Sequence, residues 1–162
     1  MNELDTKLKE LRDMLKELSD KNTQLEENVE LEKESFVKIA EISSDGFWDW
    51  DLVSNYEYMS PRFWEIFGYD HKTKEHSPEE WYSLIHPDDL KTAQENLNKH
   101  FQSKGIDPYH QEVRYKHKNG TIVWVICRGR VTSWSPTGTP LRMVGTHTDI
   151  THLKGDKQNA EW

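Results

Sequence analysis

The chain begins with a stretch in which apolar residues recur at alternating spacings of three and four. Over residues 3–40 this spacing matches the a and d positions of a heptad repeat. The positions that would form the seam are Leu4, Leu8, Leu11, Leu15, Leu18, Asn22, Leu25 and Val29. Leucine at d with a single asparagine at a is typical of a parallel two-stranded coiled coil, because paired amides fix the register. The pattern predicts a dimerising helix, and the alternative is a solvated amphipathic helix that lies on its own domain.

The period changes after residue 41. Residues 47–52 alternate with period two, which places Trp48 and Trp50 on one face of a predicted strand, and residues 56–59 form a second short strand. Ser60-Pro61 is typical of a helix start, and Gly68 of a helix end.

Two further helices are predicted before the last third of the chain. Ser77-Pro78 opens a short helix over residues 79–85, and His86-Pro87 opens a longer one that ends near Gly105. The longer helix carries a narrow apolar stripe, which consists of Leu90, Ala93, Leu97 and Phe101.

The last third of the chain predicts three antiparallel strands. Residues 109–118 and 121–134 flank Asn119-Gly120, a signal for a two-residue hairpin turn, and residues 141–149 follow a second reversal. Strands and helices in this order predict an α+β fold.

Composition separates the two regions. Residues 1–35 hold 11 acidic and 6 basic residues but no aromatic residue, Gly or Pro, and all 18 aromatic residues lie after them. The first region therefore cannot build a core. The full chain of 162 residues suits one domain with an appendage, and we expect a coiled-coil helix over 1–40, a domain over 41–151 and a linker from 152–162.

Charge and hydropathy exclude several classes of protein. The net charge is -8 without a dense basic stripe, which argues against a nucleic-acid partner. Neither a membrane span nor a signal peptide is predicted, so we expect a cytoplasmic protein. Cys127 is the single cysteine and cannot form an internal disulfide.

Several short motifs occur together in a fixed order. They are residues 45–52 (DGFWDWDL), 60–64 (SPRFW), 67–69 (FGY), 85–89 (IHPDD), 118–120 (KNG) and 149–151 (DIT). In this order they resemble a bacterial PAS domain with its C-terminal PAC motif, as found in histidine kinases and diguanylate cyclases, over residues 41–154. The resemblance implies a five-stranded antiparallel sheet with short helices on one face, in a sensory module that dimerises through its flanking helices.

The resemblance also implies where a small ligand would bind, between the sheet and the short helices. The candidate lining residues are Phe63, Trp64, Phe67, Trp81, Ile85, Ala93, Leu97, Val125 and Cys127. The alternative is that these large side chains fill the interior, and the module is then a constitutive dimerisation or docking domain without a ligand.

No cofactor or metal is predicted. A flavin photosensor of this family needs a cysteine on a short central helix, whereas Cys127 falls on a late strand. Haem-binding members commonly use a histidine of the long helix, but His100 lies about 65° from the middle of the apolar stripe, so we expect it at the solvent edge. His147 and His152 share no face with each other, which argues against a metal site with Asp149.

Catalysis by this segment is not expected. There is no phosphate-binding loop, and the acidic pairs Asp49/Asp51 and Asp88/Asp89 fall on a strand edge and in a turn.

The resemblance assigns signal handover to Trp48, Asp149 and Thr151, at the joint with an output domain of the same polypeptide. Residues 152–162 stay polar and contain Gly155-Asp156. We therefore expect a segment of a longer protein, for instance a histidine kinase, a diguanylate cyclase or phosphodiesterase, or a chemoreceptor.

Overall fold

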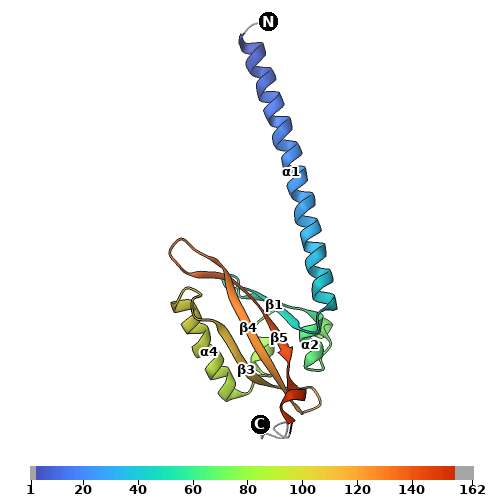
Figure 1. Cartoon of the computed structure of the whole chain (residues 1–162), viewed down its shortest axis with the longest axis vertical. Helices are drawn as coiled ribbons and strands as arrows, with labels where there is room; N and C mark the ends of the chain where they lie inside the picture. The colour runs from blue at the N-terminus through green and yellow to red at the C-terminus, as the bar shows by residue number, and fades with distance from the viewer. Residues whose placement is uncertain (1–2, 156–162) are drawn as a thin grey trace. The chain divides into compact units, whose positions relative to one another are not determined.

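The structure is a computed structural model that describes residues 3–155, and it divides the chain into two units between Ile42 and Ser43. The first unit is α1 (Glu3–Ile42), which Figure 1 shows as one continuous helix. The predicted long helix is confirmed. Ion pairs between residues one helical turn apart, such as Lys21 with Glu17 at 2.7 Å, stabilise the helix.

The apolar seam of α1 is exposed along its length. Exposed fractions run from 46% for Leu8 to 66% for Leu15, and Asn22 is exposed as well. The seam therefore consists of residue types that are normally buried in proteins, yet these side chains are exposed.

The second unit is built on an antiparallel sheet of five strands in the order β2-β1-β5-β4-β3. The strands are β1 (Gly46–Asp51), β2 (Tyr56–Met59), β3 (Tyr109–Lys116), β4 (Ile122–Trp134) and β5 (Pro140–Asp149). The predicted α+β class and five-stranded sheet are confirmed.

Helices α2 (Pro61–Ile66), α3 (Glu79–Tyr82) and α4 (Pro87–Gln102) lie between β2 and β3 in the chain. Short 3-10 turns occur at His71–Thr73 and Thr151–Leu153. Figure 1 shows α4 alongside β3, and α2 packs on β1. No described helix is both long enough and apolar enough to cross a membrane.

The starts of α2 and α4 follow the predicted capping signals, whereas the cap residue of α3 is Pro78, and no side chain caps this helix. The Ser60 hydroxyl accepts a hydrogen bond from the Phe63 amide, and the His86 ring accepts one from the Asp88 amide. Each cap is followed by a proline in the first turn, where the missing amide proton costs nothing. The helix predicted for residues 79–85 is shorter in the structure, where α3 ends at Tyr82.

The β3–β4 hairpin forms where it was predicted, but its turn is not the two-residue type. Gly120 has a φ of 91°, whereas Asn119 keeps a negative φ, and a two-residue type I′ turn needs positive φ at both positions. The His117 amide donates to Thr121 O and the Gly120 amide donates to His117 O. These bonds close a three-residue loop that ends on a left-handed glycine.

The core lies between the sheet and the helices, and two glycines of the sheet make room for a tryptophan. Trp48 pairs across the sheet with Met59 and Gly145, and Gly145 pairs with Gly129. A Cβ on Gly145 would lie 2.1 Å from both the Trp48 ring and Arg128 O, and a Cβ on Gly129 would lie 2.5 Å from that ring. The indole therefore lies flat over the middle of the sheet.

Candidate functional site

A cavity of about 40 Å³ lies between the sheet and helices α3 and α4. A water molecule needs roughly 10–15 Å³ on this measure, so the cavity has room for about three waters or one very small molecule. Its lining residues that are not fully buried are Trp50, Trp81, Tyr82, Leu90, Gln94, Leu97 and Gln111. They belong to β1, α3, α4 and β3, and the cavity therefore reaches solvent between these elements.

The nine candidate lining residues fall into two groups. Five of them line the cavity: Trp81, Ile85, Ala93, Leu97 and Cys127. The other four are buried in the core outside this lining: Phe63, Trp64, Phe67 and Val125. Three of these are the aromatic residues of α2 and of its C-terminal cap, here called the α2 aromatics, and the Phe63 ring packs edge to face with the other two and with His147.

Glu57 brings a carboxyl group to the cavity. It lies on β2, is only 4% exposed, and accepts a hydrogen bond of 2.8 Å from Trp81 Nε1 on α3. Burial raises the pKa of Glu57 to about 7, despite the opposing effect of the Trp81 bond, and the Glu79 carboxylate adds to the rise. A carboxyl group that titrates near neutral pH therefore faces the cavity.

Sequence reasoning missed Glu57, although period two alone places it on the same face of the strand as Met59. The strand alternates, with Tyr56 and Tyr58 exposed and Glu57 and Met59 buried. Because Met59 pairs with the inward-facing Trp48, period two places Glu57 on the same inner face.

Three further polar groups around the cavity have no hydrogen-bond partner among the described residues. They are Trp48 Nε1, Gln111 Nε2 and His147 Nδ1. The Gln111 carbonyl oxygen accepts from Asn96, and His147 Nε2 lies 3.2 Å from the Tyr115 hydroxyl. Buried polar atoms are normally paired, so these groups are suited to hydrogen-bond water or a ligand.

The remaining ionisable groups of the lining are uncharged near neutral pH. Burial lowers the pKa of His147 to about 3 and raises the pKa of Cys127 to about 12. Burial also raises the pKa values of Tyr82, Tyr109 and Tyr115 above the usual value for tyrosine. Glu57 is therefore the one lining group that can carry charge between pH 5 and pH 9.

The expectation that His100 lies at the solvent edge is wrong. The ring is 1% exposed, its Nδ1 lies 2.6 Å from Asp107 O, and the Val131 amide donates to Nε2 at 3.2 Å. Since Nε2 accepts, Nδ1 carries the proton and donates to Asp107. The chain after α4 and the strand β4 cover this face of the helix, which the helical position alone could not reveal.

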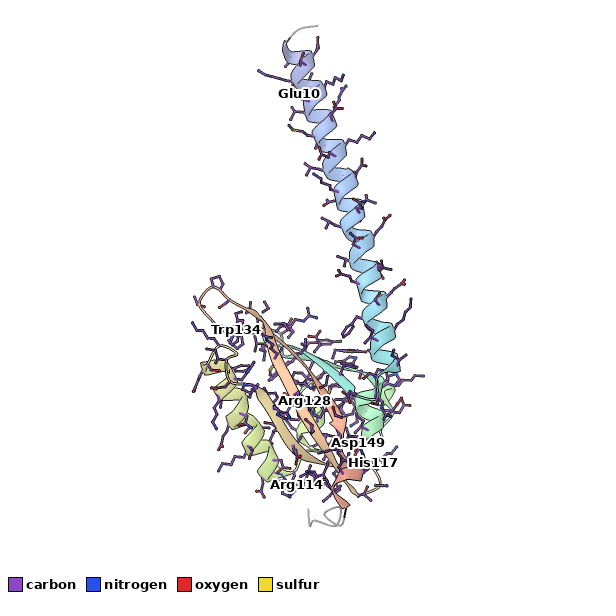
Figure 2. The ribbon with its side chains drawn as sticks, viewed as in Figure 1. Glu10, Arg114, His117, Arg128, Trp134 and Asp149 are labelled. Carbon is purple, nitrogen blue, oxygen red and sulfur yellow. The ribbon has the colours of Figure 1, made fainter. Side chains whose placement is uncertain are left out.

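The residues assigned to signal handover occupy two places. Trp48 is buried over the middle of the sheet, whereas Asp149 is the last residue of β5 and Thr151 begins the 3-10 turn after it. Asp149 Oδ1 accepts from the Thr151 amide, and Thr151 Oγ1 accepts from the Trp124 amide of β4. In Figure 2, Asp149 and Arg114 lie at one end of the sheet and Trp134 at the other.

Of the acidic pairs singled out in the sequence, Asp49, Asp51 and Asp89 form hydrogen bonds or ion pairs within the fold. Asp49 forms a two-point ion pair with Arg142, and the Asp51 carboxylate accepts from the Val53 and Ser54 amides, bonds that lower its pKa. Asp89 binds Arg114 through both carboxylate oxygens. Burial alone would raise the pKa of Asp89, but the hydrogen bonds from Arg114 outweigh burial and lower it.

Metal ligands are not grouped in the described part of the chain. Among residues 3–155, no three His, Cys, Asp or Glu side chains are placed so that they could hold a metal ion. His147 is buried at the cavity and His152 is exposed in the turn after β5.

A family model and a solved structure both indicate the same family for this chain. A sequence model of the PAS fold matches residues 56–147. The crystal structure of a sensory box histidine kinase/response regulator from Burkholderia thailandensis is 34% identical with a TM-score of 0.61, over 75% of this chain and 88% of that one. A search of curated proteins found no match.

Two more distant structures share the fold. The N-terminal domain of a diguanylate cyclase with a PAS/PAC sensor from Marinobacter aquaeolei is 19% identical, with a TM-score of 0.57 over 67% of this chain and 97% of that one. A PAS domain from Colwellia psychrerythraea is 18% identical, with a TM-score of 0.58 over 74% and 97%. At these sequence identities the similarity shows a shared fold and nothing more.

Proposed function

Because the chain belongs to the PAS fold family, we propose that it is a sensory, signal-transducing module of a larger bacterial signalling protein. The observation that carries this proposal is the cavity under the sheet, with a buried carboxyl group and unpartnered polar atoms in its wall. Such a site can bind a small molecule and change the packing around it.

Native mass spectrometry of the protein, purified without refolding, tests this proposal. A sensor is expected to retain a small molecule or to be stabilised by one, because a ligand that binds only the folded state raises stability by mass action. Bare polypeptide, together with no thermal stabilisation by a broad metabolite panel, would contradict the sensor proposal.

The size of the cavity supports a second candidate function. Trp48 and the α2 aromatics occupy most of the interior and leave only about 40 Å³. A constitutive dimerisation or docking module with a filled core is consistent with this packing. The mass spectrum and the metabolite panel together distinguish the two functions, since a docking module carries no bound mass and is not stabilised by a small molecule.

Dimerisation through α1 is the second part of the proposal. Its support is the exposed seam of leucines with one asparagine, which a second copy of the helix would bury. Two helices joined along this seam would convert a change in the sensory unit into a change in their packing.

Handover to an output domain is the third part. The bond from the Thr151 amide to Asp149, and the bond from the Trp124 amide of β4 to the Thr151 hydroxyl, give the chain a fixed exit from the sheet. By analogy with the Burkholderia protein, the output is a histidine kinase, and a diguanylate cyclase or phosphodiesterase is the alternative. Asp149→Ala in the longer protein is expected to leave the fold intact and to uncouple output from signal, whereas unchanged signalling would exclude this role.

We also propose that the module works without haem or a flavin adduct. Both ring nitrogens of His100 are engaged by backbone groups, so neither is available to a haem iron. Cys127 lies on β4 and burial raises its pKa to about 12, which keeps the thiol unreactive. No catalytic residue is proposed for this segment.

A further inference from the structure

We propose that the cavity selects a small organic cation, an alkylammonium ion of about three heavy atoms, whose charge pairs with the Glu57 carboxylate. This inference rests on the proposed sensory function and names the chemistry of its ligand.

Glu57 has no counter-ion among the described residues. In the described part of the chain no Lys, Arg or His forms an ion pair with it, and the group that donates to it is the uncharged Trp81 indole. Other carboxylates of this unit, such as Asp49 and Asp89, each have an arginine. A buried carboxylate without a cation is costly, and a positively charged ligand would relieve that cost.

No other group in the wall of the cavity can neutralise Glu57 or form an ion pair with a negatively charged ligand. The titratable groups that face the cavity from the other elements are Tyr82 of α3, Tyr109 and Tyr115 of β3, Cys127 of β4 and His147 of β5. All are neutral near pH 7, and the nearby exposed group is another carboxylate, Glu79. An anion would therefore meet only negative charge.

Aromatic side chains form part of the cavity wall. Trp50, Trp81 and Tyr82 line the side of the cavity that reaches solvent. Aromatic faces attract ammonium groups through the negative potential of the ring face, and this attraction is stronger where water is excluded. The unpartnered donors Trp48 Nε1 and Gln111 Nε2 can be satisfied by a water or hydroxyl oxygen that enters with the cation.

The size of the cavity limits the ligand. A volume of about 40 Å³ admits an ion such as ethylammonium without movement of α3 or α4, whereas a drug-sized molecule needs several hundred Å³. So small a ligand binds at best in the range of about 1 mM, because each heavy atom contributes a limited free energy.

The test compares three probes on the whole chain by thermal unfolding. Ethylammonium chloride is expected to raise Tm with increasing concentration, relative to sodium chloride at equal ionic strength. Ethanol, which has the same number of heavy atoms but no charge, and sodium acetate are expected to give no such rise. This comparison needs no variant and so does not depend on the folding of a mutant.

Glu57→Gln identifies the site. The amide can still accept from Trp81 but carries no charge, and ethylammonium is expected to bind at least tenfold more weakly to this variant. Glu79→Gln is the matched control, because it removes an exposed carboxylate of α3 and should leave binding within about twofold. Binding to the unmodified chain should strengthen from pH 6 to pH 8, as Glu57 ionises while the ligand stays protonated.

Each contrary outcome has a separate meaning. Stabilisation by ethanol equal to that by ethylammonium would overturn recognition of a cation while leaving the sensory function standing. Unchanged binding to Glu57→Gln, or no binding of ethylammonium to the unmodified chain, would also overturn the inference. The sensory function itself fails only if the native mass spectrum and the metabolite panel are both negative.

Discussion

At the scale of single residues, Glu57 makes the stability of the domain depend on pH. The pKa of its carboxyl group is about 7 in the folded chain and 4.5 as its ordinary value, because burial disfavours the charged form. Between these values the folded state holds a proton that the unfolded state has lost. The contribution of Glu57 to stability therefore falls as pH rises from about 4.5 to about 7.

We expect Glu57→Gln to gain stability relative to the unmodified chain as pH rises. The difference in unfolding free energy between the two chains should increase by on the order of 3 kcal/mol from pH 5 to pH 8, since one pKa unit corresponds to about 1.4 kcal/mol. Urea unfolding at several pH values measures this difference. A difference that stays constant with pH would contradict the position assigned to the carboxyl group.

The variant must be compared with the unmodified chain because His147 changes stability with pH in the direction opposite to Glu57. Burial lowers its pKa from 6.5 to about 3, so the folded state releases a proton that the unfolded state keeps. Its contribution to stability is therefore gained as pH rises from about 3 to 6.5 and is lost in acid. Because both chains contain His147, its effect cancels in the difference.

The polar lining could not be predicted from hydrophobicity alone. In β2 the two tyrosines are the larger apolar groups, yet they are exposed and Glu57 is buried. The pairing of Met59 with Trp48 decides which face turns inward, and that pairing is a tertiary contact. The aromatic and aliphatic lining residues Trp81, Ile85 and Leu97 were predicted, because the family resemblance locates the interior.

At the scale of elements, most helices and strands follow from local signals. Capping residues and prolines fix the starts of α2 and α4, and period-two alternation fixes β1. The exceptions depend on contacts distant in sequence. The position of His100, for example, depends on Val131, which lies 31 residues away on β4.

His100 joins three elements, and its replacement tests that connection. We expect His100→Leu to lower the unfolding free energy by roughly 2–4 kcal/mol, because it leaves the Val131 amide and Asp107 carbonyl without their partner. His110→Leu is the control, since His110 is exposed on β3 and should change stability by about 0.5 kcal/mol or less. Equal losses in the two variants, measured by denaturant unfolding, would contradict the bridging role of His100.

At the scale of the whole molecule, the chain combines two units with different requirements for stability. The unit from Ser43 onward has its own core, whereas α1 has no aromatic residue before Phe36 and leaves its leucines exposed. An isolated helix gains little stability from propensity alone and normally needs packing on an apolar face. The heptad pattern predicts that this face is the leucine seam.

Two substitutions in the seam decide whether a second copy covers it. We expect Leu15→Lys with Leu18→Lys to give a folded monomer, because two chains would bring four lysines into one apolar seam. Thr23→Lys with Leu31→Lys is the matched control, since it adds the same charge at heptad positions b and c, away from the seam. Light scattering should give the mass of one chain for the seam variant and of two for the control. A dimer in both variants would mean that the chains associate through another surface, and the leucines of α1 would then need a different partner.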